Sequence, residues 1–338
     1  MKPTAIARLL LLSALSWNTP LFAGDYSNHP EARRFVDEMV KKHGLPRAEV
    51  QAAIDAARRK QSILDAIARP AEAKPWYQYR PIFLTEDRIR GGVAYWREHR
   101  AILDDVRDKL GVDPAYVVAI IGVETRYGKH AGRYRVLDAL ATLGFDYPPR
   151  GAFFRGQLEE FLLLAREERI DLLQATGSYA GAMGHGQFIP GSYRDYAIDF
   201  DGDGRRDLWH SPRDIIGSVA NYLRRHGWRL GAPVAQRARV KGEAHRSLLE
   251  KGLKPAVKVA ELDRYGVQPV GPAAPEARVA LIELEQRDGP EYWLGYNNFY
   301  VITRYNRSPL YAMAVHQLAG EIAKRFSLFA GESAHSGR

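Results

Sequence analysis

The stretch from Asp113 to Gly128 constrains the fold most, because it is an apolar segment with helix signals at both ends and one acid inside. Asp113 is a favourable N-cap residue, Pro114 suits the first helical position, and Gly128 is a natural residue to end a helix. A helix that is apolar all round is usually buried. A carboxyl group at Glu124, near the negative end of the helix dipole, is therefore harder to ionise. This setting indicates a general acid, with a structural salt bridge to a nearby base as the alternative.

The N-terminus has the pattern of a secretory signal. Residues 1–23 combine a basic start, an apolar run from Leu9 to Trp17 and a small-residue cleavage site that ends at Ala23. The run is too short for a transmembrane anchor, and a buried N-terminal helix is the alternative. The chain has no cysteine, which excludes disulfides, thiolate metal sites and a lipid-anchored cysteine. We expect a soluble periplasmic protein without a membrane anchor.

The chain is basic, with a formal net charge of +9. Basic secreted proteins bind anionic polymers such as cell-wall glycans or nucleic acid, and a merely solvated basic surface is the alternative. The sequence contains no zinc-binding His-Glu-x-x-His helix, no phosphate-binding glycine loop and no recognised nucleic-acid motif. Nucleic acid is therefore not an expected partner.

The remaining pattern predicts an α+β fold that is mostly helical. Helical spacing and caps predict helices over residues 30–43, 46–60, 85–110, 150–169, 211–227 and 308–326. The aromatic segment Trp76–Phe83 is predicted to be extended, since Pro81 disfavours helix before it. From Gly231 to Gly295, short alternating runs separated by Gly and Pro predict a small antiparallel β domain. The tail from Gly331 is polar, and we expect it to fray.

Residues 199–210 match an EF-hand loop at most positions. Oxygen ligands occupy loop positions one, three, five and nine, and Gly204 stands at the sharp turn. The last position should offer a bidentate carboxylate but holds His210. The loop predicts a structural Ca²⁺ (or Na⁺) site, and an Asp/Gly-rich turn without metal is the alternative.

Several separated motifs occur in one order along the chain. They are Glu124–Gly128, Ser178–Gly184, Gly186–Pro190, the 199–210 loop, Gly217–Leu223, Ile302–Asn306 and Leu310–Val315. Together they resemble the lytic murein transglycosylase B family. The resemblance implies an α domain (24–110, completed by 307–326), a lysozyme-like catalytic core (111–228), a small β domain (231–300) and a tail (327–338).

The resemblance also implies roles for individual residues. Glu124 is the expected catalytic acid and base. The expected substrate-binding residues are Tyr79, Ser178, Gln187, Tyr305, Asn306 and Tyr311. The expected ion ligands are Asp199, Asp201, Asp203, Arg205 through its carbonyl, and His210. Arg80 and Arg126 could complement carboxylates of the substrate, or they could be structural ion pairs.

The implied reaction cleaves the N-acetylmuramic acid–N-acetylglucosamine bond without water. Most glycosidases use two carboxylates, but the sequence offers only Glu124 in an apolar helix. By the resemblance, the substrate's acetamido group takes the second role, no cofactor is needed for catalysis, and the product is a 1,6-anhydro sugar. Alternatives are a muramidase that uses water and a non-catalytic glycan-binding protein. Expected partners are peptidoglycan strands, with other cell-wall enzymes as further candidates, and we expect a monomer.

Overall fold

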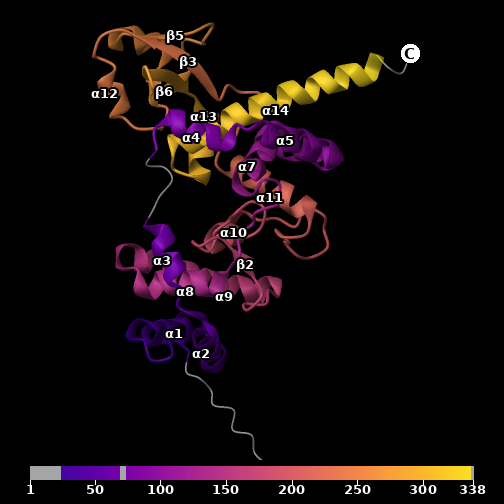
Figure 1. Cartoon of the computed structure of the whole chain (residues 1–338), viewed down its shortest axis with the longest axis vertical. Helices are drawn as coiled ribbons and strands as arrows, with labels where there is room; N and C mark the ends of the chain where they lie inside the picture. Colours follow the sequence, from indigo (N-terminus) through magenta and orange to yellow (C-terminus); the bar gives the residue numbers. More distant parts are fainter. Residues whose placement is uncertain (1–23, 69–73, 336–338) are drawn as a thin grey trace, which may run out of the picture.

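The computed structural model describes residues 24–68 and 74–335, and it is predominantly helical. The molecule is elongated in Figure 1, with α1 and α2 at one end and a β-sheet at the opposite end. This architecture confirms the predicted α+β, mostly helical fold class. The predicted signal peptide, residues 1–23, lies outside the described residues.

Five helices build the end of the molecule that contains the N-terminal part of the chain (Figure 1). They are α1 (Pro30–His43), α2 (Arg47–Ala56), α3 (Gln61–Ile67), α8 (Val136–Asp146) and α9 (Gly151–Glu168). Nearly all of α8 is buried, since α3 and α9 pack against it. The buried carboxylate of Asp138 accepts hydrogen bonds from the Arg58 backbone and from the Arg135 guanidinium. These bonds tie the start of α8 to the link between α2 and α3.

A second group of helices packs on α7 (Pro114–Thr125) or on the helices that contact α7. It comprises α4 (Trp76–Phe83), α5 (Glu86–Glu98), α6 (Arg100–Leu110), α10 (Pro190–Tyr196), α11 (Pro212–Arg225), α13 (Asn297–Tyr305) and α14 (Pro309–His335). α7 contacts α5, α6, α11 and α14 directly. Every residue of α7 except Tyr116 and Glu124 is buried, which confirms the prediction of a buried apolar helix. Among the described residues, no helix has the length and apolar character that a bilayer span requires.

Residues 24–110 are divided between the two groups, because α3 packs on α8 whereas α4 and α5 pack on α14. The domain boundaries given above stay a prediction. Four short elements remain. β1 (Tyr134–Arg135) pairs with β2 (Thr176–Gly177), a 3-10 helix at Pro148–Arg150 joins α8 to α9, and a 3-10 helix at Val259–Tyr265 lies in the β domain.

The β domain is a five-stranded antiparallel sheet in the order β4-β6-β7-β3-β5. Its strands are β3 (Ala235–Val240), β4 (Val257–Lys258), β5 (Val267–Pro269), β6 (Arg278–Gln286) and β7 (Gly289–Gly295), with α12 (Arg246–Leu249) beside them. Alternating runs in the sequence, at residues 238–240, 256–259, 267–270 and 279–284, predict four of these strands, and β7 was missed. The segment begins Gly-Pro-Glu, which hides its alternation, and its pairing with β6 across a two-residue turn makes it a strand.

Three of the segment predictions were wrong. The helix predicted over 46–60 ends at Ala56, because Ala57 is extended with ψ of 141°, and a separate helix, α3, begins at Gln61. Residues 76–83 form helix α4 and not an extended segment, because Trp76 and Tyr79 lie one turn apart and both bury their rings. That burial outweighs the hydrogen bond lost at Pro81 inside the helix. The single helix predicted over 85–110 is broken at His99, whose ψ of 25° separates α5 from α6.

The ends of α7 and the C-terminal end of α14 also differ from the prediction. α7 ends at Thr125, and Arg126 rather than Gly128 takes the first left-handed position, with φ of 50°. Asp113 occupies the N-cap position but makes no capping bond; its carboxylate accepts from Trp228 Nε1 at 3.0 Å. α14 continues to His335, beyond the point where fraying was expected.

One buried side chain secures the link between the helical core and the sheet. Asn298 is fully buried; its carbonyl accepts from the Arg229 backbone at 2.9 Å, and its amide donates to the Arg229 carbonyl at 2.7 Å. Asn297, next to it, makes only an exposed bond to Gly227.

We predict that Asn298→Ala lowers the free energy of unfolding by about 1–3 kcal/mol, because both backbone partners lose their acceptor or donor. Asn297→Ala is the matched control and should have a smaller effect. Urea unfolding of both variants tests this, and equal losses would contradict the assigned role of Asn298.

Candidate active site

The end of α7 places the candidate catalytic acid at the edge of the buried core. Glu124 is half-buried and is the residue before the last of the helix. Arg126 and Tyr127 both have positive φ, of 50° and 61°, so the chain turns sharply directly after the acid. Non-glycine residues rarely take this conformation; here tertiary contacts hold it.

Tyr127 supplies those contacts. Its hydroxyl donates to the Arg88 carbonyl at 2.8 Å. Its ring fills space left by three glycines, since a Cβ at Gly91, Gly92 or Gly122 would lie 2.8, 2.7 or 2.5 Å from a Tyr127 atom. The glycines of α5 and α7 therefore let this ring lie between the two helices and fix the turn after Glu124.

Thr125 connects the same turn to the glycine-rich loop, which comprises residues 177–190. Its hydroxyl donates to the His185 carbonyl at 3.0 Å and accepts from the Gly128 amide at 3.0 Å. Within that loop, Gly177 and Phe188 both pair with Met183 through β-bridges. The loop and the end of α7 thus form one bonded unit.

Tyrosines gather around Glu124. Tyr311 of α14 is 3% exposed, and its hydroxyl donates to Glu124 Oε1 at 2.6 Å. Tyr305 donates to the Gly186 carbonyl at 2.5 Å. Burial raises the pKa of both hydroxyls well above the ordinary value, and the nearby charge of Glu124 raises each pKa further. Both tyrosines therefore stay neutral donors at physiological pH.

Tyr79 is the third of the predicted substrate tyrosines. It is 2% exposed, and its ring lies 5.0 Å from Phe83 and 6.3 Å from Trp76. An electrostatic interaction with Tyr79 contributes to the raised pKa of Tyr311. The structure thus places Tyr311 and Tyr305 at Glu124, whereas Tyr79 is a buried residue of α4, which packs on α14.

The side chains of the other three predicted substrate residues make hydrogen bonds to nearby backbone groups. Ser178 Oγ accepts from the amides of Ala180 and Ala182, at 3.3 and 3.0 Å. Gln187 has φ of 51°, and its amide donates to the carbonyls of Ala131 and Gly184. Asn306 caps the turn before α14 by accepting from the Ser308 amide at 3.1 Å.

A pocket of about 620 Å³ opens beside these residues. Gln187 and Tyr305 line it, together with the rings of Phe188, Tyr196 and Tyr222. Rings that present flat apolar faces beside polar groups are suited to sugars, which have apolar faces and hydroxyl edges. The pocket is therefore a candidate place for sugar units; Tyr305 lines it, whereas Glu124 does not.

The two candidate arginines differ in setting. Arg80 donates from Nε to Gln317 Oε1 at 2.8 Å on the exposed side of α4. Arg126 is exposed and lines a different pocket, together with Arg88 and Lys129.

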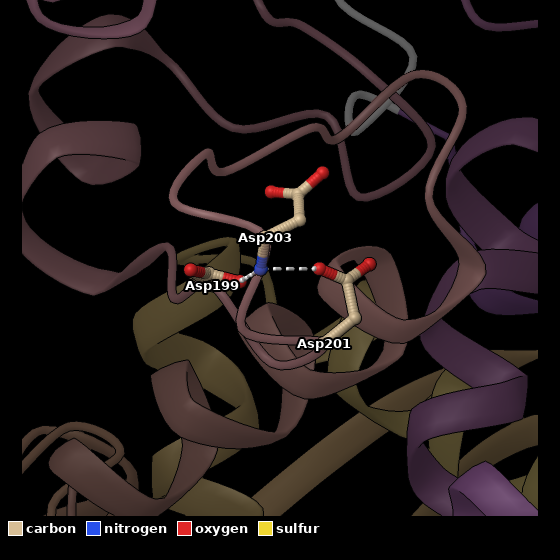
Figure 2. Close-up of side chains that lie close together, drawn as sticks. All are labelled: Asp199, Asp201 and Asp203. Carbon is tan, nitrogen blue, oxygen red and sulfur yellow. Dashed lines mark hydrogen bonds between the residues drawn. The ribbon is translucent and has the colours of Figure 1, made fainter.

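The 199–210 loop brings three of its five predicted ligands together, as Figure 2 shows. Carboxylate oxygens of Asp199, Asp201 and Asp203 lie within 4.8 Å of one another. Backbone hydrogen bonds from Gly204 and its neighbours hold the pKa of Asp199 below its usual value, so this carboxylate is ionised. Clustered carboxylates of this kind suit Ca²⁺, which takes oxygen ligands.

His210 does not join this cluster. Its side chain is 83% exposed, and Nδ1 lies 3.1 Å from Asp207 Oδ2. Asp207 in turn accepts from the Trp209 amide. These two residues therefore close the end of the loop, while the carbonyl of Arg205 remains as a candidate ligand by its position.

Sequence reasoning missed Asp214. The residue pattern Ser211-Pro-Arg-Asp214 is typical of a capping box, and the Ser211 hydroxyl does cap α11 by accepting from the Asp214 amide. The buried Asp214 carboxylate, however, accepts from the amides of Phe200 and Asp207, at 2.7 and 2.8 Å. It joins both ends of the 199–210 loop to α11, and the repeated Asp pattern of the loop could have pointed to it.

Comparison with known proteins agrees with this site. Residues 27–320 match the family model described as transglycosylase SLT domain. The chain is 44% identical over 316 residues to the membrane-bound lytic murein transglycosylase B of Escherichia coli (strain K12), across 90% of this chain and 86% of that protein.

Solved structures give the same result. The catenated lytic transglycosylase SltB1 from Pseudomonas aeruginosa is similar with a TM-score of 0.84 and 49% identity, across 89% of this chain and 100% of that one. Escherichia coli Slt35 in complex with calcium has a TM-score of 0.81 and 44% identity, across 90% and 96%. The resemblance found in the sequence is confirmed: the chain belongs to the transglycosylase SLT domain family and is a lytic transglycosylase.

Proposed function

We propose that the protein cleaves the β-1,4 bond between N-acetylmuramic acid and N-acetylglucosamine in murein, without water, and that Glu124 serves as acid and then as base. The hydrogen bond from Tyr311 to Glu124 supports this proposal most. It fixes one carboxylate oxygen, Oε1, at 2.6 Å, so the carboxyl group has one defined orientation at the end of a buried helix. Murein is the substrate named for the Escherichia coli relative.

In the first step, protonated Glu124 donates its proton to the glycosidic oxygen. The bond between that oxygen and C1 of the muramyl sugar breaks, and N-acetylglucosamine leaves with a hydroxyl group. The acetamido carbonyl oxygen of the muramyl sugar bonds to C1 and gives an oxazolinium. A single carboxyl group suffices because the substrate supplies the nucleophile that a second carboxylate gives in most glycosidases.

In the second step, ionised Glu124 takes the proton of the muramyl C6 hydroxyl. That oxygen attacks C1, the bond to the acetamido oxygen breaks, and the product is a 1,6-anhydro sugar. The proton is back on Glu124, and no water is consumed. Tyr311 stabilises the carboxylate between the two steps, because a hydrogen bond donated to an ionised group favours the ionised form.

Ser178 and Gln187 hold the loop that faces this chemistry. Ser178 accepts from two amides, which leaves its hydroxyl hydrogen to donate, and the carbonyl of the substrate acetamido group is an acceptor of the right kind. Gln187 and Tyr305 line the adjoining pocket and would contact sugar units there. Asn306 lies directly after Tyr305 and positions the start of α14, which carries Tyr311.

We predict that Glu124→Gln lowers the turnover of purified sacculi by about 10²–10⁴-fold, because both proton transfers are lost. Circular dichroism should show an unchanged fold. Glu98→Gln, at an exposed glutamate of α5, is the control and should retain activity. Near-normal turnover by Glu124→Gln would contradict the assignment.

A second prediction concerns Tyr311→Phe. Loss of the donated hydrogen bond favours the protonated form of Glu124, so the alkaline limb of the kcat/KM profile should move about one unit to higher pH. Tyr305→Phe is the matched control, because Tyr305 donates to the Gly186 carbonyl and not to Glu124. The alkaline limb of the Tyr305→Phe profile should stay at the wild-type pH. An equal shift in both variants would exclude a specific role for Tyr311.

We further propose that the 199–210 loop holds Ca²⁺ as a structural ion. Asp199, Asp201, Asp203 and the Arg205 carbonyl are its protein ligands, and His210 is not. The clustered carboxylates support this, as does the calcium complex of Slt35. The ion neutralises the carboxylates of the loop and takes no part in the proton transfers.

Calcium should therefore raise the melting temperature of the protein. At about 100 times its Kd, it adds about 2.7 kcal/mol of stability. Asp203→Asn should remove most of this gain, whereas Asp263→Asn, at an exposed aspartate outside the loop, should keep it. A melting temperature that does not respond to calcium or to a chelator would contradict the site.

We also propose that the protein works in the periplasm after removal of residues 1–23. The secretory pattern of that segment supports this location, as does the position of murein outside the inner membrane. N-terminal sequencing of the protein from the envelope fraction tests the proposal, and an intact N-terminus would contradict it.

A further inference from the structure

A second pocket, of about 570 Å³, lies between α5 and the turn that follows α7. Four side chains in its wall carry a permanent positive charge, and one carries a negative charge. The residues that line it are Thr85, Asp87, Arg88, Arg90, Gly91, Ala94, Arg126, Tyr127, Lys129 and His130. The single acid, Asp87, is paired with Arg90. The remaining cations therefore face the pocket without a carboxylate of their own in its wall.

Arg88 is the buried member of this group. Only 7% of it is exposed, and one of its amino groups donates to the Ile82 carbonyl at 3.0 Å. Its guanidinium also lies 5.0 Å from the centre of the Phe83 ring. Its Nε is buried and has no hydrogen-bond partner among the described residues. A buried donor without an acceptor is costly, so the pocket contains an arginine that lacks a partner for part of its donor set.

The charges around Arg88 also favour the binding of an anion. Burial, and then the nearby charge of Arg126, lowers the pKa of Arg88. Like charges that are held together in a pocket are relieved when an anion binds between them. The pocket therefore favours an anionic ligand on grounds of both hydrogen bonding and charge.

The pocket is built into the same structure that holds Glu124. Arg126 follows Glu124 by two residues, and Tyr127 fixes the turn by its bond to the Arg88 carbonyl. On the other side, the ring of Phe83 lies 5.0 Å from the Arg88 guanidinium and 5.0 Å from the Tyr79 ring. Helix α4, which carries Tyr79 and Phe83, packs on α14, which carries Tyr311. A ligand in this pocket would thus lie near a sugar that is bound at Glu124.

We propose that this pocket binds a carboxylate of the peptide stem of murein while the glycan strand lies at Glu124. The inference rests on the proposed function, since murein carries short peptides with free carboxyl groups. The N-acetylglucosamine units are uncharged, and the lactyl carboxyl group of a peptide-bearing muramyl sugar is part of the amide bond to the peptide. The carboxylates of the peptide are therefore the anions nearest to the reacting bond. Guanidinium groups bind carboxylates through paired hydrogen bonds. Arg88 and Arg126 recognise the carboxylate, and Lys129 adds charge at the rim.

The test compares two substrates: glycan strands with their peptides, and the same strands after an amidase has removed them. The double variant Arg126→Gln/Lys129→Gln changes only exposed side chains, so it should fold. We expect its kcat/KM on peptide-bearing strands, relative to stripped strands, to fall about tenfold, mainly through KM. The double variant Arg100→Gln/Arg107→Gln on α6, also exposed, is the matched control and should keep the wild-type ratio.

A binding measurement distinguishes a peptide carboxylate from free phosphate as the anion that the pocket binds. The probe is a synthetic stem tripeptide with free carboxyl groups, titrated into Glu124→Gln protein by calorimetry, with its fully amidated form and inorganic phosphate as comparisons. Binding of the free tripeptide, loss of binding on amidation, and loss in the Arg126→Gln/Lys129→Gln background support the proposal. Phosphate that binds in the pocket and is not displaced by the tripeptide would overturn it.

The experiments can disprove the stem-peptide pocket and the proposed function separately. If wild-type protein releases anhydromuramyl products but the ratio between substrates is unchanged in the Arg126→Gln/Lys129→Gln variant, only the stem-peptide pocket is wrong. If no anhydromuramyl product forms from either substrate, the proposed function itself is wrong.

Discussion

The hydrogen bond from Tyr311 to Glu124 is the interaction on which the site depends. It joins α14, at the C-terminal end of the chain, to the end of α7, although the two residues are 187 positions apart. The bond gives a lone carboxyl group a fixed orientation and stabilises its ionised form. In the function that we propose, Glu124 acts first as an acid and then as a base, and it needs both properties because it crosses between charged and neutral forms within one turnover.

The surroundings of α7 make that bond possible. The helix is buried by α5, α6, α11 and α14, so its end cannot shift without disturbing the core. Tyr127 fits between α5 and α7 because glycines leave room for its ring, and Thr125 ties the turn to the glycine-rich loop. Glu124 is thus held from three directions by parts of the chain that are distant in sequence.

The sequence allowed much of this to be predicted, and the remainder depends on distant contacts. The buried helix, its single acid and four strands of the sheet follow from local pattern, and the tyrosines followed from the family resemblance. Helix α4 and strand β7 were not found, because tertiary burial and pairing with β6 override their local signals. Asp214 and the unpaired Nε of Arg88 were also missed, since each acquires its role from neighbours that only folding supplies.

The central claim is that Glu124 transfers protons within the substrate and water takes no part. The most direct measurement is digestion of sacculi by the wild-type protein in H₂¹⁸O, followed by mass spectrometry of the released sugars. The account predicts anhydromuramyl ends that carry no ¹⁸O. Reducing muramyl ends that carry ¹⁸O at C1 would contradict it and would identify a hydrolase.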